Sequence, residues 1–241
     1  PLEAPVIKAV FPCNIFISLL FSTFTGTKII WQIYSLDFNY RTLNTSNYNF
    51  LAPFYKSLSR LVFGKGLEQG ATHYFYRIKE KEKVLIVGGG NGELLKSLYN
   101  VCPSATVTYC EFSSKMIGLA NKKNPFLKEQ ISFLEKDAFT LEDFGFDWVI
   151  LPFFLDQFEG EQCVSFLKKI MEKSKENTQI LFSDMHEAGI SKVLLGTMYF
   201  FFKITTGLKN NKLPDFNKVF VEAGWIKEKE ELFSNGRVLS G

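Results

Sequence analysis

The chain has 241 residues, of which 46% are hydrophobic and 22% charged, so it suits one α/β domain with an appendage and can bury a core. Its formal net charge of +3 is small, and no Lys/Arg block interleaves with aromatic residues, which argues against a nucleic-acid partner. The 4 cysteines form no CxxC pair and no metal-ligand spacing with the 2 histidines. We therefore expect free thiols, a cytoplasmic location and no metal site.

The first 46 residues form an apolar segment whose role the sequence leaves open. The chain starts at Pro1 rather than Met, so we expect a fragment or a processed product. Residues 9–27 carry no charge and just reach the roughly 20 apolar residues that a membrane-spanning helix needs, although polar residues dilute them. Three interpretations remain: an apolar cap over the domain, a weak anchor making peripheral membrane contact, or a segment not native to the mature protein.

From residue 47 onward the sequence predicts one α/β domain. Apolar residues at helical spacing over residues 48–63 predict a helix that ends at Gly64. Further helices are predicted over residues 91–99, 114–121 and 159–175. Short apolar stretches predict strands at "KVLIVG", "ATVTYCE", "ISFLEKD", "DWVILPF" and "QILFSDM". Alternation of strands and helices indicates a parallel sheet with helices on both faces.

The C-terminal part changes pattern. "LPDFNKVFVEAGW" predicts a helix that ends at Gly224, and "WIKEKEELF" alternates like a partly exposed strand. "RVLSG" predicts one more strand, and Asn235-Gly236 is a typical turn between antiparallel strands. We therefore expect a mostly parallel sheet that ends in an antiparallel hairpin.

The loop after the first predicted strand is the first candidate ligand site. Gly88, Gly90 and Gly92 form G-x-G-x-G, and glycines there allow unusual φ angles and close approach of a ligand to the backbone. A dinucleotide fingerprint needs a further glycine where Glu93 stands, and no Gly-Lys-Ser/Thr ending of a Walker loop follows. A plain tight turn explains one or two of these glycines but not their spacing.

Acidic residues end the next two predicted strands. Glu111 ends the second strand, where a carboxylate can accept two hydrogen bonds from a ribose diol. Asp137, followed by Ala138, ends the third strand and can lie at an adenine edge. Each acid alone also fits a solvated strand end. Together with the glycine loop, however, they place polar groups at one edge of the sheet.

The order "VLIVGGGNG … TYCEFS … EKDAF … FDWVILPFFLDQF … QILFSDMH" resembles that of the class I S-adenosylmethionine-dependent methyltransferases. "YNFLAPFYKSLSRLVFG" is similar to the helix that leads to the glycine loop in the small-molecule branch that includes the ubiquinone and menaquinone methylases. The resemblance covers roughly residues 48–241. It implies a Rossmann-like α/β sandwich with a mostly parallel seven-stranded sheet, and S-adenosyl-L-methionine as the cofactor.

The resemblance also implies roles for individual residues. The glycine loop would wrap the methionine part of the cofactor, while the next strand ends would hold the ribose, the adenine and the surroundings of the methyl group. The implied cofactor-binding residues are Gly88, Gly89, Gly90, Asn91, Gly92, Glu111, Phe112, Asp137, Ala138, Leu151 and Pro152. One residue departs from the family pattern, because Ile86 stands where an acid usually helps to orient the methionine end.

The acceptor is expected to be small and apolar, such as a quinone or a lipid. "FLAPFY", "LPFFLDQF" and "VLLGTMYFFFKITTGL" are rich in aromatic residues and nearly free of acids, although core packing accounts for many of the 26 phenylalanines. The candidate pocket residues are Phe54, Tyr55, Phe153 and Phe154. Transfer from a sulfonium is an in-line displacement, and only a weakly acidic acceptor needs a base.

His186 is the candidate base, because it follows the fifth predicted strand; a solvent-facing loop histidine is the simpler interpretation. Two alternatives to a methyltransferase remain. One is a catalytically silent domain of the same fold that serves as a scaffold or membrane-associated partner. The other, less favoured, is an aminopropyltransferase, which would need an aspartate where "ILPFF" stands. The sequence predicts no oligomeric state.

Overall fold

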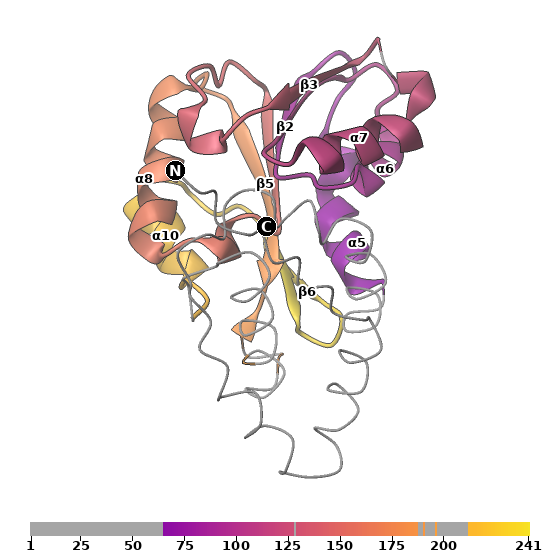
Figure 1. Cartoon of the computed structure of the whole chain (residues 1–241). Coiled ribbons are helices and arrows are strands. Elements are labelled where there is room, and N and C mark those ends of the chain that lie inside the picture. The colour runs from indigo at the N-terminus through magenta and orange to yellow at the C-terminus, as the bar shows by residue number, and fades with distance from the viewer. Residues whose placement is uncertain (1–64, 128, 188–189, 191–195, 197–211) are drawn as a thin grey trace, which may run out of the picture. The chain divides into compact units, whose positions relative to one another are not determined.

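The computed structural model describes residues 65–127, 129–187, 190, 196 and 212–241 (Figure 1). The predicted N-terminal apolar segment and the predicted helix over residues 48–63 lie outside these residues, as do Phe54, Tyr55 and nearly all of "VLLGTMYFFFKITTGL". Predictions about these segments, including the domain boundary at residue 46, therefore stay predictions.

The described part consists of strands with α-helices and short 3₁₀ helices (η) between them. Its first half contains α5 (Gly66–Thr72), η2 (His73–Arg77), β1 (Lys83–Val87), α6 (Glu93–Val101), β2 (Thr106–Glu111), α7 (Ser114–Lys123), η3 (Pro125–Leu127) and β3 (Ile131–Glu135). Its second half contains η4 (Ala138–Thr140), β4 (Trp148–Pro152), η5 (Leu155–Gln157), α8 (Gly160–Lys173), β5 (Gln179–Met185), α10 (Phe216–Glu222), β6 (Glu231–Phe233) and β7 (Val238–Ser240).

The strands form one 7-stranded sheet in the order β3-β2-β1-β4-β5-β7-β6. Strands β1 to β5 are parallel, whereas β7 runs antiparallel to β5 and β6. The predicted mostly parallel sheet with an antiparallel C-terminal hairpin is thus confirmed. Strand order reverses between β1 and β4, and ligands of open α/β sheets bind beyond the carboxyl ends of strands at such a point.

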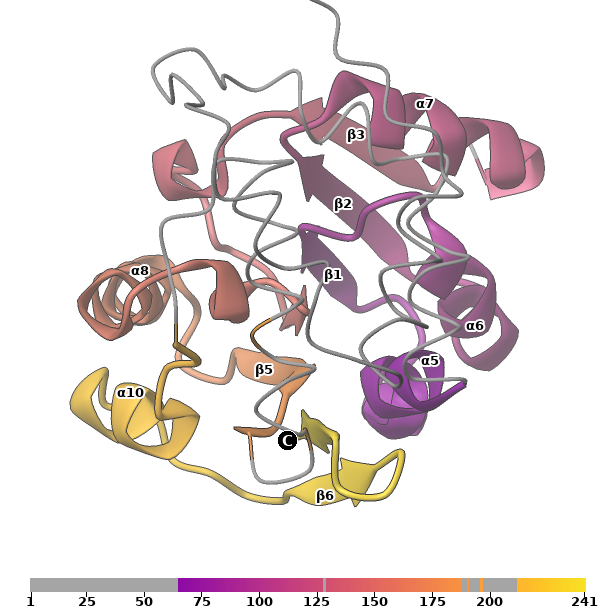
Figure 2. The same ribbon diagram turned by 60° about the horizontal axis from the view of Figure 1, so that its bottom comes forward.

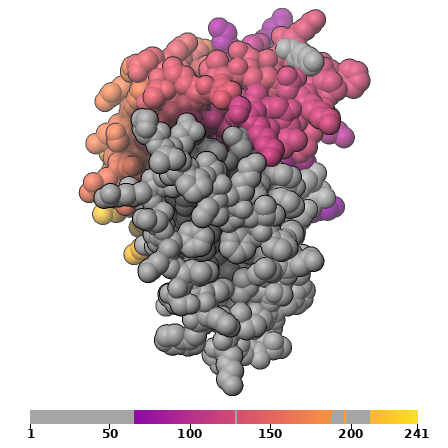
Figure 3. Space-filling view, viewed as in Figure 1, coloured from indigo at the N-terminus to yellow at the C-terminus, as the bar shows by residue number. Residues whose placement is uncertain are grey.

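Helices cover both faces of the sheet, as Figure 2 shows for α5, α6 and α7 on one side and α8 and α10 on the other. Strand β1 is buried on both faces, because Val84 and Ile86 pack under α5 and α6 while Leu85 and Val87 pack under α8 and α10. Successive side chains of a strand point to opposite faces, so a continuous apolar run is what such a central strand requires. In the space-filling view α8 (orange) lies to the left and the α7 region (magenta) to the right (Figure 3).

Helix α5 was not expected from the sequence. Its Gly66 and Gly70 lower helix propensity, and Lys65 makes no side-chain cap. The glycines are needed for packing, because a Cβ on Gly66 would lie 2.2 Å from Ser234 Cβ and one on Gly70 would lie 2.6 Å from Val238 Cγ1. Contact with the C-terminal hairpin therefore overrides local propensity here.

Two predicted boundaries were wrong. The strand expected over residues 225–233 is only Glu231–Phe233, since the charged residues before it are exposed, with Ile226 90% accessible, and bury no apolar face. The helix predicted over residues 159–175 is Gly160–Lys173, because Glu159 is its cap and forms a reciprocal capping box with Gln162.

The three cysteines of the described residues, Cys102, Cys110 and Cys163, are buried free thiols, as expected. None of the described helices combines the length and the apolar character needed to cross a membrane.

Replacement of Phe144 by alanine tests the core under α8. Phe144 is fully buried among the side chains of this layer, so we expect Phe144→Ala to lower the free energy of unfolding by about 3–5 kcal/mol. Phe126→Ala is the matched control, because Phe126 is 96% exposed and its loss should change stability by no more than about 0.5 kcal/mol. Urea unfolding of both variants measures the difference, and equal losses would contradict the assigned core.

Candidate active site

The loop from Gly88 to Gly92 joins β1 to α6 at the carboxyl edge of the sheet. Gly92 is the residue before α6 and has a φ of 77°, in the left-handed region that glycine adopts most easily. A Cβ there would lie 2.7 Å from the Cβ of Ala120 on α7. Gly90 has a φ of 63°, but among the described residues no heavy atom lies within 4 Å of a Cβ built on it. Its backbone is therefore open to a ligand.

The side of this loop that faces the core packs against two aromatic rings. A Cβ on Gly88 would lie 2.8 Å from Phe154 Cδ2, and a Cβ on Gly89 would lie 2.5 Å from both Cζ and the hydroxyl oxygen of Tyr109. Gly89 is not among the glycines with a positive φ. Its side chain is therefore excluded by close packing and not by backbone conformation.

Glu111, the last residue of β2, contacts the loop directly. Its Oε2 accepts a hydrogen bond from the Gly90 N–H at 3.0 Å, and its Oε1 accepts one from the Ser113 N–H at 2.9 Å. Burial raises the pKa of the Glu111 carboxyl, and these backbone hydrogen bonds oppose the shift. The backbone N–H of Phe112 also interacts with this carboxylate. Since a carboxylate offers about four lone-pair sites, Glu111 keeps acceptor capacity for a further donor. This arrangement fits a hydroxyl of a ribose.

Beside Glu111, Phe112 leaves a large apolar surface exposed, with 46% of the residue accessible. Such a ring at a strand end offers a face on which a flat base can stack. The family resemblance had already named Phe112 as a cofactor-binding residue, and the structure adds that its ring is exposed. Its place in the three-dimensional arrangement, next to the carboxylate that holds the loop, makes it a candidate adenine contact.

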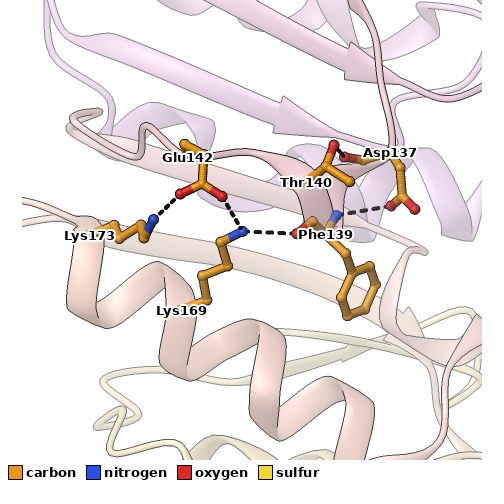
Figure 4. A network of polar contacts seen from close by, with 6 residues as sticks. All are labelled: Asp137, Phe139, Thr140, Glu142, Lys169 and Lys173. Carbon is orange, nitrogen blue, oxygen red and sulfur yellow. Dashed lines mark hydrogen bonds and ion pairs between the residues drawn. The ribbon is translucent and has the colours of Figure 1, made fainter.

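Asp137 belongs to a separate network of polar contacts at the end of β3 (Figure 4). Its Oδ1 accepts the Phe139 N–H at 3.0 Å and so caps η4, while Ala138 is buried. Lys169 of α8 donates to the Phe139 carbonyl oxygen at 2.9 Å and, together with Lys173, pairs with Glu142. Hydrogen bonds from Lys173 and then Lys169 lower the pKa of the Glu142 carboxyl. The structure thus gives Asp137 a role in its own turn, whereas Glu111 bonds to the glycine loop.

Leu151 and Pro152 are the last residues of β4 and are buried. Leu151 belongs to the core under α8, as does Phe154, whose ring supports Gly88. Phe153 lies between them with a φ of 52°, which is rare for a residue with a side chain, and its N–H donates to the Ser183 carbonyl oxygen at 2.7 Å. Of these four, only Phe153 is partly exposed and is held in a strained backbone beside the loop.

Two acids lie close together near the carboxyl ends of β4 and β5, the partly buried Asp156 in η5 and Asp184 within β5. Asp184 is fully buried; its Oδ2 accepts the Asp156 N–H at 3.1 Å and its Oδ1 accepts the Met185 N–H at 2.8 Å. Burial, reinforced by the negative charge of Asp156, raises the pKa of Asp184 well above its ordinary value. Burial also raises the pKa of Asp156 to about 7. The parallel pairing of β4 with β5 brings these two acids together, so their proximity is not visible in the sequence alone.

His186 follows β5 directly, as predicted. The ring nitrogen Nδ1 of His186 lies 3.0 Å from the Gly236 carbonyl oxygen. The backbone N–H of His186 donates to the Arg237 carbonyl oxygen at 2.9 Å. When Nδ1 carries the proton and donates to Gly236, Nε2 is left as the basic nitrogen. The imidazole is therefore oriented by the C-terminal hairpin. Among the described residues no group of three His, Cys, Asp or Glu side chains could hold a metal ion.

Comparison with known proteins agrees with this geometry. Residues 84–177 match the methyltransferase-domain family. An 8-hydroxyquercetin 8-O-methyltransferase from Mentha piperita is 27% identical over 160 residues, which are 61% of this chain but 41% of that protein. The chain thus spans about two fifths of this relative's length.

Solved structures of methyltransferases share the fold. PigF with SAH superposes with a TM-score of 0.63 at 16% identity, covering 93% of this chain and 68% of PigF. The O-methyltransferase NcsB1 from neocarzinostatin biosynthesis, in complex with S-adenosylmethionine and 2-hydroxy-5-methyl naphthoic acid, gives a TM-score of 0.61 at 16% identity, covering 93% of this chain and 66% of NcsB1. The predicted ubiquinone- and menaquinone-methylase branch stays a prediction. The sheet order, the glycine loop with Glu111, and the match of residues 84–177 to the methyltransferase-domain family together agree with the fold of the class I S-adenosylmethionine-dependent methyltransferases.

Proposed function

We propose that this chain is an S-adenosylmethionine-dependent methyltransferase that methylates an oxygen of a small, largely apolar acceptor. The observation that carries the proposal is the contact between Glu111 and Gly90, which builds a carboxylate with spare acceptor capacity beside an open stretch of backbone. The relatives support an oxygen acceptor, since one is named for O-methylation of a flavonoid and another is an O-methyltransferase bound to a naphthoic acid.

The cofactor, when bound, supplies a methyl group already activated on a sulfonium sulfur. Glu111 would hold the ribose hydroxyls, and the exposed ring of Phe112 would stack on the adenine, with Ala138 and Asp137 at its edge. Gly90 and Asn91 would line the methionine part, where the backbone is open. The work of the protein is then mainly to bind and orient, because an in-line displacement gains most from proximity.

We propose His186 as the base that takes the proton from a hydroxyl acceptor. Its hydrogen bond to the Gly236 carbonyl oxygen would keep Nε2 free to accept that proton. Asp156 is a second candidate, because burial raises the pKa of its carboxyl to about 7, in the range that suits a base at neutral pH. Asp184 is less suited, since both of its oxygens accept backbone N–H groups that hold the turn after β4.

The apolar character of the acceptor remains part of this proposal. Phe153, partly buried at the end of β4, contributes the described apolar surface beside the loop, and Phe54 and Tyr55 would complete it. A silent scaffold is the second candidate function, favoured by one observation: Ile86 is fully buried in the core, in the place where the family usually has an acid.

Titration with S-adenosylhomocysteine compares Gly90→Ala with Gly118→Ala. Both added methyl groups meet no heavy atom of the described residues within 4 Å, but only Gly90 faces the proposed ligand, and only its φ of 63° adds backbone strain to an alanine. We expect Gly90→Ala to weaken binding about tenfold or more, since forcing a methyl group into a filled contact costs about 1–3 kcal/mol. Gly118→Ala, inside α7, should stabilise that helix by about 0.5–1 kcal/mol and leave affinity unchanged.

Isothermal titration calorimetry measures both affinities. The absence of binding by the unchanged chain would refute the enzyme and favour the scaffold. Equal affinities of the two variants would place the ligand elsewhere.

Methyl transfer to 8-hydroxyquercetin and to 2-hydroxy-5-methyl naphthoic acid, the compounds named for the two relatives, tests the base when it is followed with radiolabelled cofactor. We expect His186→Asn to lower kcat by about 10²–10⁴-fold, the usual contribution of a general base, while the affinity for S-adenosylhomocysteine stays unchanged. Asp156→Asn should retain most of the activity. A base with the pKa of about 7 found for Asp156 would make the rate rise with pH through that value. Loss of this rise in Asp156→Asn, with His186→Asn active, would assign the role to Asp156.

A further inference from the structure

Tyr109 is a fully buried residue of β2 that contacts the glycine loop from below. Its hydroxyl donates a hydrogen bond to the Gly90 carbonyl oxygen at 2.8 Å, and its ring excludes any side chain at Gly89. The ring is held in turn by Phe133 of β3, with 5.3 Å between the ring centroids. Its position is therefore set by the sheet and not by the loop that it supports.

Tyr109 and Glu111 act on the same peptide. They are two residues apart on one strand, so their side chains leave the same face of the sheet. Glu111 accepts the N–H of Gly90, and Tyr109 donates to the carbonyl oxygen of the same residue. Both polar backbone atoms of Gly90 are thus held by side chains of β2. The space that a Cβ of residue 90 would occupy is free of other atoms of the described residues.

The neighbouring strand β1 contributes no polar group at this level. Ile86 is the residue paired with Tyr109 in the parallel register, and it is fully buried. Tyr109 therefore pairs with the apolar Ile86 on β1, and its hydroxyl donates to the Gly90 carbonyl oxygen in the loop. The side-chain hydrogen bonds that orient the Gly90 peptide therefore come from β2 and not from the strand from which the loop emerges.

We propose that Tyr109 is a positioning residue for cofactor binding: with Glu111 it clamps the Gly90 peptide, so that the open face of the loop and the spare lone pairs of Glu111 meet the same S-adenosyl ligand. This inference rests on the proposed function and deepens it, because it names the group that orients the loop in a chain with isoleucine at position 86.

The chemistry of the hydroxyl suits this task. Burial, and then the negative charge of Glu111, raise the pKa of Tyr109 well above its ordinary value. The phenol therefore keeps its proton at any pH at which the enzyme works, and remains a donor to the Gly90 carbonyl oxygen. A phenylalanine keeps the ring under Gly89 and removes this donor, together with the acceptor that the hydroxyl oxygen offers to the Gly92 N–H of the same loop.

Tyr109→Phe is the test, and Tyr99→Phe is its matched control. Tyr99 is also a buried tyrosine whose hydroxyl donates to a backbone carbonyl oxygen, that of Gln130 at 3.2 Å, in a turn just before β3. Loss of one such hydrogen bond should lower the stability of both variants by a similar amount. In Tyr109→Phe alone we expect the dissociation constant of S-adenosylhomocysteine to rise about three- to tenfold.

Hydrogen exchange of the ligand-free protein supplies a second readout. Tyr109→Phe should speed exchange of the Gly90 amide, because residue 90 then keeps the hydrogen bond to Glu111 but loses the one from Tyr109. Tyr99→Phe should leave this exchange unchanged. Unchanged exchange and affinity in Tyr109→Phe, or equal changes in both variants, would overturn the clamp. A chain that binds no S-adenosylhomocysteine at all would refute the proposed function, while the exchange experiment still decides whether Tyr109 holds the loop.

Discussion

The close packing of the glycine loop on two aromatic rings is the constraint on which the candidate site depends. Phe154, just after β4, lies under Gly88, and Tyr109 of β2 lies under Gly89. Because these rings come from either side of β1, the loop is fixed at the point where strand order reverses. Its upper surface is then left to backbone groups, and Gly90 presents them without a side chain in the way.

Electrostatics divides the carboxyl edge of the sheet into two parts. Near β2, Glu111 is partly buried and accepts hydrogen bonds from backbone N–H groups, which favour its charged form and leave it capacity for a further donor. Near β4 and β5, burial raises the pKa values of Asp156 and Asp184, and the negative charge of Asp156 adds to the shift of Asp184. Glu111 is therefore suited to accept hydrogen bonds from hydroxyl groups, while Asp156 and Asp184 can hold a proton near neutral pH.

Structural features that depend on residues close together in the sequence could be predicted. The apolar run before Gly88, the acid at Glu111 and the Asn235-Gly236 turn each depend on near neighbours in the chain, and the strands, the loop and the hairpin follow from them. Helix α5 and the shortened β6 were not predictable, because their limits depend on contacts with distant residues such as Ser234 and Val238. The same holds for the pairing of Asp156 with Asp184, which needs β4 and β5 side by side.

The sequence by itself determined the class of fold and the position of the glycine loop, since strand and helix periods and glycine spacing are local properties. Only the tertiary structure decided why the loop has three consecutive glycines. Gly88 and Gly90 adopt left-handed backbone angles, whereas Gly89 does not and is a glycine because the ring of Tyr109 occupies the space of a side chain. That reason lies on another strand, and parallel pairing of β1 with β2 is what brings the two together.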